Sequence, residues 1–389
     1  MYEWFLEYWT VILFYVGISL VIYLNRKKFD FEGIVMLYKT KFGIKAMQKY
    51  AKKYPRLISS LATMGIWTGW LGMIVIIAMV FYGIYQLIFF PQAPAMFTPV
   101  LPGFQVPGGP RIPLITGLLA LFIVIVVHEF AHGVVSKLHK IKIKSSGFAM
   151  VGPIPAAFVE PDEKALNKAS VKKQLGIYAA GPFSNVLLAI LIVIIQLGLV
   201  LAVLPGFTAD GLTVVSSEFN DNLTGIKIIG ADNTNISTAG DLHNFLNQRN
   251  PGDEILLTSP EGNIPVTLQS HPTDNTSAYM GVTLQQEIGA KGPLLQTVKP
   301  VVFWFIGNPF STNLTSSLGL LGWIYLLSLG IGLVNLLPLG PVDGGRMLLI
   351  TLKKYMNEKL AEKIWYYTSV TLVAMLILLI FVPIIRNMF

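Results

Sequence analysis

Two histidines and a glutamate stand together in an otherwise apolar stretch of the sequence. The run VIVVHEFAHGVVSK places His128 and His132 four residues apart, with Glu129 directly after the first histidine. On an α-helix this spacing puts both imidazoles on one face, one turn apart. The pattern, HExxH, is typical of zinc sites in which the histidines bind the metal and the glutamate takes a proton from the attacking water. The alternative is a structural, hydrogen-bonded histidine pair at a helix end.

A catalytic zinc site needs a third protein ligand and keeps its fourth position open. The chain has no cysteine, so this ligand must be a nitrogen or oxygen donor. His139 lies in a lysine-rich segment, and His243 and His271 belong to a later segment of different character. Asp343, in NLLPLGPVDGGRM, follows an apolar run that ends on the side to which His132 points, and is the best remaining ligand. A helix cap or turn aspartate is the alternative for Asp343.

These ionisable groups lie in a chain with the composition of a polytopic membrane protein. Its 389 residues are 53% hydrophobic and only 13% charged, too apolar for an ordinary soluble domain. A helical span needs roughly 20 apolar residues. Six segments meet or approach this length, at residues 9–24, 61–90, 114–135, 175–204, 318–337 and 364–384. Ionisable groups at membrane depth are costly and usually mark a site, which strengthens the metal interpretation.

The distribution of basic residues predicts the orientation of the chain. Lysine and arginine crowd segments 26–56, 137–173 and 346–363, which we expect on the cytoplasmic side. Segment 205–313 has few basic residues and contains all four N-x-S/T sequons, so we expect it outside. Arg386 is discordant, because six spans would place it outside as well. The net charge of +8 reflects this bias and indicates no nucleic-acid partner. We expect a multi-pass protein of the cell membrane.

Two of the connecting segments have patterns of their own. Segment 34–54, IVMLYKTKFGIKAMQKYAKKY, mixes apolar residues and lysines at helical spacing and predicts a solvated or membrane-surface helix. Segment 205–290 contains alternating runs such as LTVVS and EILLTS, turn signals and one helical stretch, AGDLHNFLNQR. Its order resembles a PDZ domain over residues 207–286. The stretch SSEFNDNLTG does not match the peptide-carboxylate loop of that family, so peptide binding stays open.

Three motifs, in order, resemble the site-2 protease family of intramembrane zinc metalloproteases over residues 114–352, with the PDZ-like domain as an insert. HEFAH matches the HExxH of the family, and GPFSN, which ends at Asn185, matches its Gly-Pro-x-x-Asn motif. NLLPLGPVDGG, from Asn335 through Asp343, matches its Asn-x-x-Pro…Asp-Gly motif. This last motif departs at Gly340, where proline is usual, and at Val342, where leucine is usual.

The resemblance implies hydrolysis of peptide bonds within transmembrane protein substrates in the lipid bilayer, as in regulated intramembrane proteolysis. It implies Zn²⁺ held by His128, His132 and Asp343, with Glu129 as the catalytic base; two histidines and a carboxylate in this motif favour zinc over iron. Asn185 and Asn335 would bind substrate or shape the site. The alternative for each asparagine is a buried amide that joins helices.

Segment 145–161, SSGFAMVGPIPAAFVEP, resembles the membrane-associated β-hairpin of the same family. Ala156 stands where we would expect glycine. A transmembrane helix hides its peptide bonds in its own hydrogen bonds, so a protease must hold an unwound form of it. The edge of the hairpin could pair with such a segment. The alternative is an interfacial loop.

We therefore expect an α-helical polytopic membrane protein of about six transmembrane helices with one small β-rich PDZ-like insert. The predicted parts are a two-span N-terminal extension with a basic cytoplasmic segment, the first part of a catalytic membrane core, an external PDZ-like domain, a linker with the second part of the core, and a C-terminal transmembrane helix, at residues 1–113, 114–204, 205–290, 291–352 and 353–389.

Two other functions compete with the protease. A non-catalytic membrane adaptor would bind partners through the PDZ-like domain and keep zinc only as structure. The intact Glu129 argues against this adaptor, because a structural zinc site gains nothing from a base. A transporter would show inverted halves, and the two motif-bearing spans share no pattern. The sequence defines neither the substrate nor the oligomeric state.

Overall fold

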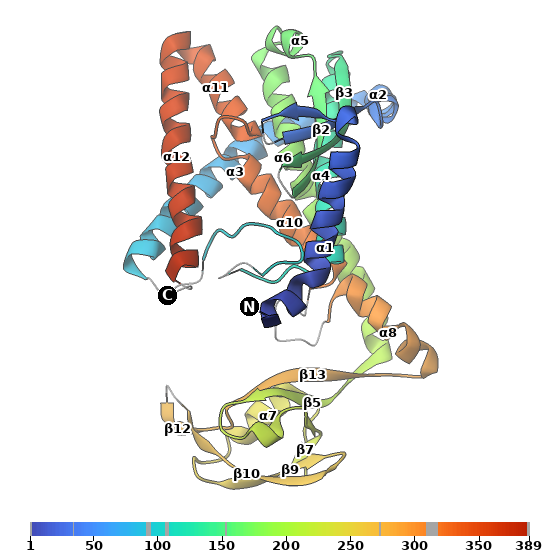
Figure 1. The fold of residues 1–389 in the computed structure, drawn as a ribbon, viewed down its shortest axis with the longest axis vertical. Coiled ribbons are helices and arrows are strands. Elements are labelled where there is room, and N and C mark those ends of the chain that lie inside the picture. The colour runs from blue at the N-terminus through green and yellow to red at the C-terminus, as the bar shows by residue number, and fades with distance from the viewer. Residues whose placement is uncertain are drawn as a thin grey trace. The chain divides into compact units, whose positions relative to one another are not determined.

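The chain divides into two compact units in a computed structural model (Figure 1). Unit 1 comprises Met1–Ile194 and Gly322–Phe389, and unit 2 comprises Ile195–Leu321. The structure describes residues 2–33, 35–90, 95–105, 109–151, 154–271, 274–308 and 318–386. The sequon at Asn313 lies outside these described residues.

Unit 1 is mostly helical. Its helices are α1 (Tyr2–Leu24), η1 (Arg26–Lys28), α2 (Ile44–Lys53), α3 (Pro55–Phe89), α4 (Leu114–Leu138), α5 (Glu163–Asn167), α6 (Val171–Val203), α10 (Leu320–Asn335), α11 (Asp343–Tyr355) and α12 (Glu358–Arg386); α6 and α10 each cross the boundary with unit 2. Among the described residues, α3, α4, α6 and α12 are long and apolar enough to cross a membrane. The predicted spans at 9–24 and 318–337 coincide with α1 and α10, whose apolar stretches are shorter. The described part of the chain thus has four helices that could cross a membrane, and six spans stay a prediction.

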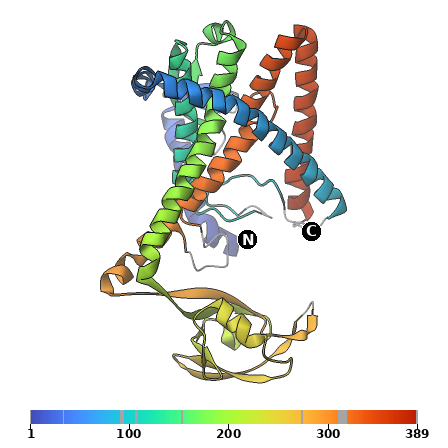
Figure 2. The same ribbon diagram turned by 180° about the vertical axis from the view of Figure 1, so that it is seen from behind.

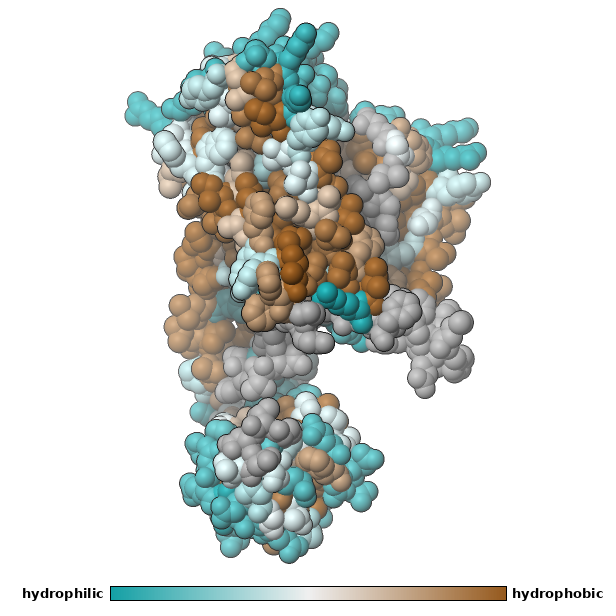
Figure 3. Space-filling view, turned by 90° about the vertical axis from the view of Figure 1, so that its left-hand side faces the viewer, coloured by the Kyte–Doolittle hydropathy of each residue, from teal (hydrophilic) through white to brown (hydrophobic). Residues whose placement is uncertain are grey.

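The surface of unit 1 is suited to lipid. On the face seen in Figure 3, apolar side chains cover the middle of the unit and hydrophilic ones gather at one end. Trp67, Leu71 and Ile74 on α3 are 74%, 63% and 64% exposed. Soluble monomers rarely expose apolar patches of this kind, so unit 1 is the part of the protein that lies in the membrane.

The core of unit 1 joins helices that are distant in the sequence. Met73, Ile76 and Val80 of α3 pack with Ala179 of α6 and Leu379 of α12. Figure 2 shows α3 running obliquely across α6 and α10. Leu336 and Leu337, in the break between α10 and α11, belong to the same core. This packing therefore holds the break beside α6.

A four-stranded antiparallel sheet also belongs to unit 1. Its order is β1-β2-β3-β4, formed by β1 (Asp30–Glu32), β2 (Val35–Thr40), β3 (Ile143–Val151) and β4 (Ile154–Pro161). Strands β3 and β4 pair from Ile143 with Pro161 to Val151 with Ile154, so the predicted hairpin is present. Residues 152 and 153, between the two strands, lie outside the described part of the chain. Strand β4 packs on α4, which carries both histidines of the HExxH motif.

The prediction of one helix across segment 34–54 was wrong for its first half. Val35–Thr40 forms β2, which pairs with β3, and only Ile44–Lys53 forms a helix. Gly43 separates them with a left-handed backbone, at φ 77°. The segment forms a strand despite its helical periodicity, because β3 supplies hydrogen-bond partners for its backbone. Strand β3 lies more than 100 residues away in the sequence, so a local pattern cannot indicate it.

Unit 2 contains a small β-rich domain, as the alternating runs predicted. Its strands are β5 (Phe207–Ser217), β6 (Lys227–Ile228), β7 (Gly230–Ala231), β8 (Thr234–Asn235), β9 (Glu254–Ser259), β10 (Gly262–Thr267), β11 (Gln269–His271), β12 (Asp274–Tyr279) and β13 (Val282–Ala290), and its helices are η2 (Leu204–Gly206), η3 (Asp221–Leu223), α7 (Ala239–Leu246) and α8 (Pro293–Ile306). The sheets have the orders β10-β9-β7-β8, β13-β5-β6 and β11-β12.

Helix α7 lies where the single helical stretch was predicted. It begins with a capping box, in which the Thr238 hydroxyl accepts the Asp241 N–H and the Asp241 carboxylate accepts the Thr238 N–H. These hydrogen bonds lower the pKa of Asp241. Leu242 and Phe245 of α7 pack into a core with Leu212 and Ile228 of the strands. Unit 2 therefore has its own hydrophobic core, and its likeness to a PDZ domain remains a prediction.

Candidate metal centre

Helix α4 brings His128 and His132 together at the depth of the apolar core. The two side chains are one turn apart on the buried face, and the residues are 5% and 9% exposed. Their Nε2 atoms are 3.1 Å apart. Burying two polar rings is unfavourable unless they have partners, and each ring has contacts at both nitrogens.

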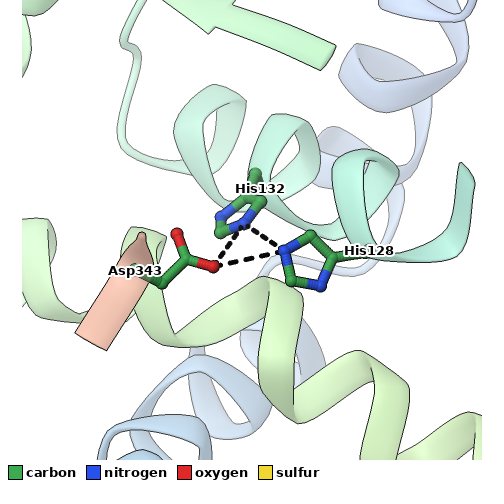
Figure 4. A group of neighbouring side chains, drawn as sticks. All are labelled: His128, His132 and Asp343. Carbon is green, nitrogen blue, oxygen red and sulfur yellow. Dashed lines mark hydrogen bonds and ion pairs between the residues drawn. The ribbon is translucent and has the colours of Figure 1, made fainter. Parts of the chain in front are cut away.

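Asp343 reaches the histidines because the chain breaks between two helices. Helix α10 ends at Asn335 and α11 begins at Asp343, and the prolines and glycines of NLLPLGPVDGG lie between and just after. Proline and glycine disfavour a continuous helix through this stretch. Oδ2 of Asp343 lies 3.2 Å from Nε2 of His128 and 3.3 Å from Nε2 of His132. Figure 4 shows the three side chains turned towards one another.

The spacing of these three donor atoms fits a zinc ion. In a tetrahedral site with zinc–ligand bonds of about 2.0–2.1 Å, neighbouring donor atoms lie roughly 3.3 Å apart. The three distances here are 3.1, 3.2 and 3.3 Å. Among the described residues, this is the one group of three or more histidine, aspartate or glutamate side chains that could hold a metal ion.

Gly181 on α6 leaves room beside the histidines. A Cβ atom at this position would lie 2.5 Å from Nε2 of His128 and closer still to Nε2 of His132. Only the absence of a side chain allows α6 to approach the donor atoms so closely. Sequence reasoning recognised this glycine as part of a motif and gave it no role. A glycine inside a helix lowers helix stability by about 1 kcal/mol relative to alanine. This cost was the signal that Gly181 has a role.

Helix α6 also supplies partners for the outer ring nitrogens. Nδ1 of His132 lies 2.7 Å from the backbone carbonyl oxygen of Ile177. Nδ1 of His128 lies 3.3 Å from Nδ2 of Asn185, which is fully buried. Metal-binding histidines usually have such a partner on the nitrogen that does not face the metal.

Glu129 points towards strand β4. Its Oε2 accepts a hydrogen bond of 2.9 Å from the backbone N–H of Val159. Glu129 and the three donor residues line one cavity of about 260 Å³, which Asn335 also lines. Five of the six predicted site residues therefore line this one cavity. The sixth, Asn185, contacts His128.

The remaining histidines lie elsewhere. His139 caps the end of α4 and lines a different cavity, beside Lys172 and Lys173. Burial and the charge of Lys173 lower its pKa. His243 belongs to α7 and His271 to β11, both in unit 2.

Comparison with known proteins agrees with this geometry. An uncharacterised protein of Methanocaldococcus jannaschii is 29% identical over 189 residues, which cover 46% of this chain and 48% of that protein. The chain therefore spans about half the length of this curated relative. A model of peptidase family M50 matches residues 116–379, which include all three motifs. The chain thus belongs to peptidase family M50, the site-2 protease family that its motifs resemble.

Proposed function

We propose that the protein is an intramembrane zinc metalloprotease that hydrolyses peptide bonds of transmembrane protein substrates in the lipid bilayer. One observation carries the proposal. Nε2 of His128, Nε2 of His132 and Oδ2 of Asp343 converge at the spacing of a tetrahedral zinc site, and Glu129 lines the same cavity. A family of metalloproteases and an apolar helical unit around the site both support it.

Each residue has a distinct role in this mechanism. His128, His132 and Asp343 hold the zinc, which when bound activates a water and polarises the scissile carbonyl. Glu129 takes a proton from the attacking water and passes it to the leaving nitrogen. Asn335, at the end of α10, lines the cavity where the substrate backbone must lie, and we assign it a substrate contact.

The substrate is held in extended form along strand β4. Strand β2 pairs with the other side of β3, and β4 is one of the two edge strands of the sheet. The Val159 N–H points away from β3, because it bonds to Glu129. Hydrogen-bond direction alternates along an antiparallel strand, so Ala157 also turns its N–H and carbonyl away from β3. An unwound substrate segment that paired with this edge would lie directly beside the catalytic base.

We also propose how the chain is arranged in the membrane. The segments α1 and α10 add two spans to the four long helices, which gives six. The basic segments then face the cytoplasm, and the domain at 205–290 lies outside. We propose that this domain is PDZ-like; its order of strands and one helix supports this.

Removing the base and removing a ligand should have different effects. Glu129→Gln keeps the shape of the side chain but cannot accept a proton, so this variant should bind zinc like the parent and cleave about 10²–10⁴-fold more slowly. His128→Ala and Asp343→Ala should lose zinc and activity together. The measurements are zinc content of the purified protein and cleavage of a transmembrane peptide in vesicles.

Two outcomes would contradict the mechanism. Cleavage by Glu129→Gln at the parental rate would remove the glutamate from the chemistry. A parent protein that binds zinc but cleaves no transmembrane peptide, while the domain at 205–290 captures partners, would replace the protease by the adaptor.

A further inference from the structure

The side chain of Asn185 holds an unused hydrogen-bond acceptor beside a metal-ligand histidine. Asn185 is 0% exposed, and its Nδ2 lies 3.3 Å from Nδ1 of His128. Its Oδ1 is also buried, and it has no hydrogen-bond partner among the described residues. Buried polar atoms without a partner are uncommon and call for an explanation.

The two histidines must carry their protons on the same ring position to bind zinc. Nδ1 of His132 faces a backbone carbonyl, which can only accept, so this nitrogen carries the proton and Nε2 is free to bind metal. Nε2 of His128 faces the same point, next to Asp343. Metal binding through that Nε2 likewise requires the proton of His128 to be on Nδ1.

A protonated Nδ1 of His128 needs an acceptor, and the amide of Asn185 is within reach. Nδ2 is a donor and cannot serve, whereas Oδ1 can. Turning the planar amide over exchanges these two atoms with almost no change of shape. Oδ1 then faces Nδ1 of His128, and Nδ2 takes the position at which Oδ1 has no partner. We infer that Asn185 is a positioning residue, which accepts a hydrogen bond from Nδ1–H of His128 through Oδ1 and so keeps Nε2 turned to the metal. This role rests on the proposed zinc site.

The joining of helices does not depend on this amide. The Ser328 hydroxyl of α10 donates to the backbone carbonyl of Asn185 at 2.8 Å. That contact survives any substitution of the Asn185 side chain. The side chain is therefore available for a role at His128, and Ser328 offers a matched control.

Two substitutions separate an acceptor from a donor. Asn185→Asp keeps an acceptor of the same size, and Asn185→Leu keeps the bulk without one. We expect Asn185→Leu to weaken zinc affinity by about 10–100-fold, whereas Asn185→Asp should match or exceed the parent. Ser328→Ala should leave zinc affinity unchanged. The measurement is competition for zinc between the purified full-length protein and a chromophoric chelator at neutral pH, with helix content checked by circular dichroism.

The results discriminate between the possible roles of Asn185. Equal zinc affinity of Asn185→Leu and the parent would overturn the inference. Weakening in Asn185→Asp as large as in Asn185→Leu would also overturn it, because the donor Nδ2 would then be the important atom. If the parent binds zinc and the variants behave as expected but no peptide is cleaved, the proteolytic function fails and the positioning role stands. A parent that binds no zinc overturns both.

Discussion

At the scale of single residues, Gly181 brings the backbone of α6 close to the two histidines. It can do so because glycine has no side chain. A Cβ atom would enter the space between the two Nε2 atoms, where the zinc is proposed to lie. Gly181→Ala should therefore abolish zinc binding, although alanine favours a helix by about 1 kcal/mol. Zinc content of the purified variant is the measurement.

Gly198, in the same helix, is the control for this substitution. A Cβ atom at Gly198 would meet nothing within 4 Å. Gly198→Ala should keep the full zinc content and the parental helix content. Parental zinc content in Gly181→Ala would show that the metal lies elsewhere.

At the scale of elements, β4 contacts Glu129, the proposed catalytic base, and carries the proposed substrate edge. Pro155, Ala157 and Val159 are alternate residues of β4 and share one orientation in the strand. Pro155 has no backbone N–H, so the strand already tolerates proline at an outward position. Proline is tolerated on an edge where the missing N–H faces outward. Ala157→Pro should keep the β3–β4 hairpin and bound zinc, and should reduce cleavage because an outward donor is lost. Cleavage rate and zinc content are the two measurements.

Ala157→Val is the matched control, since valine keeps the N–H and favours strands. It should cleave at close to the parental rate. Proline on β3, at Phe148 or Ala149, is a poorer test, because β3 is paired on both sides and would lose bonds to β2 or β4. Unchanged cleavage by Ala157→Pro would exclude pairing through the Ala157 N–H.

At the scale of the whole molecule, the orientation in the membrane can be tested by thiol labelling without background from native cysteines. The chain has no cysteine, so one introduced cysteine is the only thiol. Lys164→Cys lies on α5, in a segment predicted to be cytoplasmic, and Glu261→Cys lies between β9 and β10, in the domain predicted to be external. An impermeant maleimide should label Glu261→Cys in intact cells and Lys164→Cys only after permeabilisation. Labelling of Lys164→Cys in intact cells would reverse the orientation.

The sequence by itself determined the parts of the molecule whose causes are local. His128 and His132 share a face because a helix turns once in about 3.6 residues, and the composition of the long apolar runs required a membrane. The β-rich domain with one helix was also predicted, because alternating runs and turn residues act over a few residues. The hairpin was predicted from its resemblance to the hairpin of the family. Asp343 was predicted to be a ligand by elimination and by a motif.

Only the tertiary structure decided which distant groups meet. His128 and Asp343 are 215 residues apart in the sequence, and their distance depends on how α4, α6 and the α10–α11 break pack. Strand β2 replaced part of a predicted helix because β3 offered it a partner. The same packing revealed the closeness of Gly181, the acceptor on Asn185 and the Val159 N–H at Glu129. Contacts of this kind depend on interatomic distances within a packed core, and no periodicity along the chain encodes them.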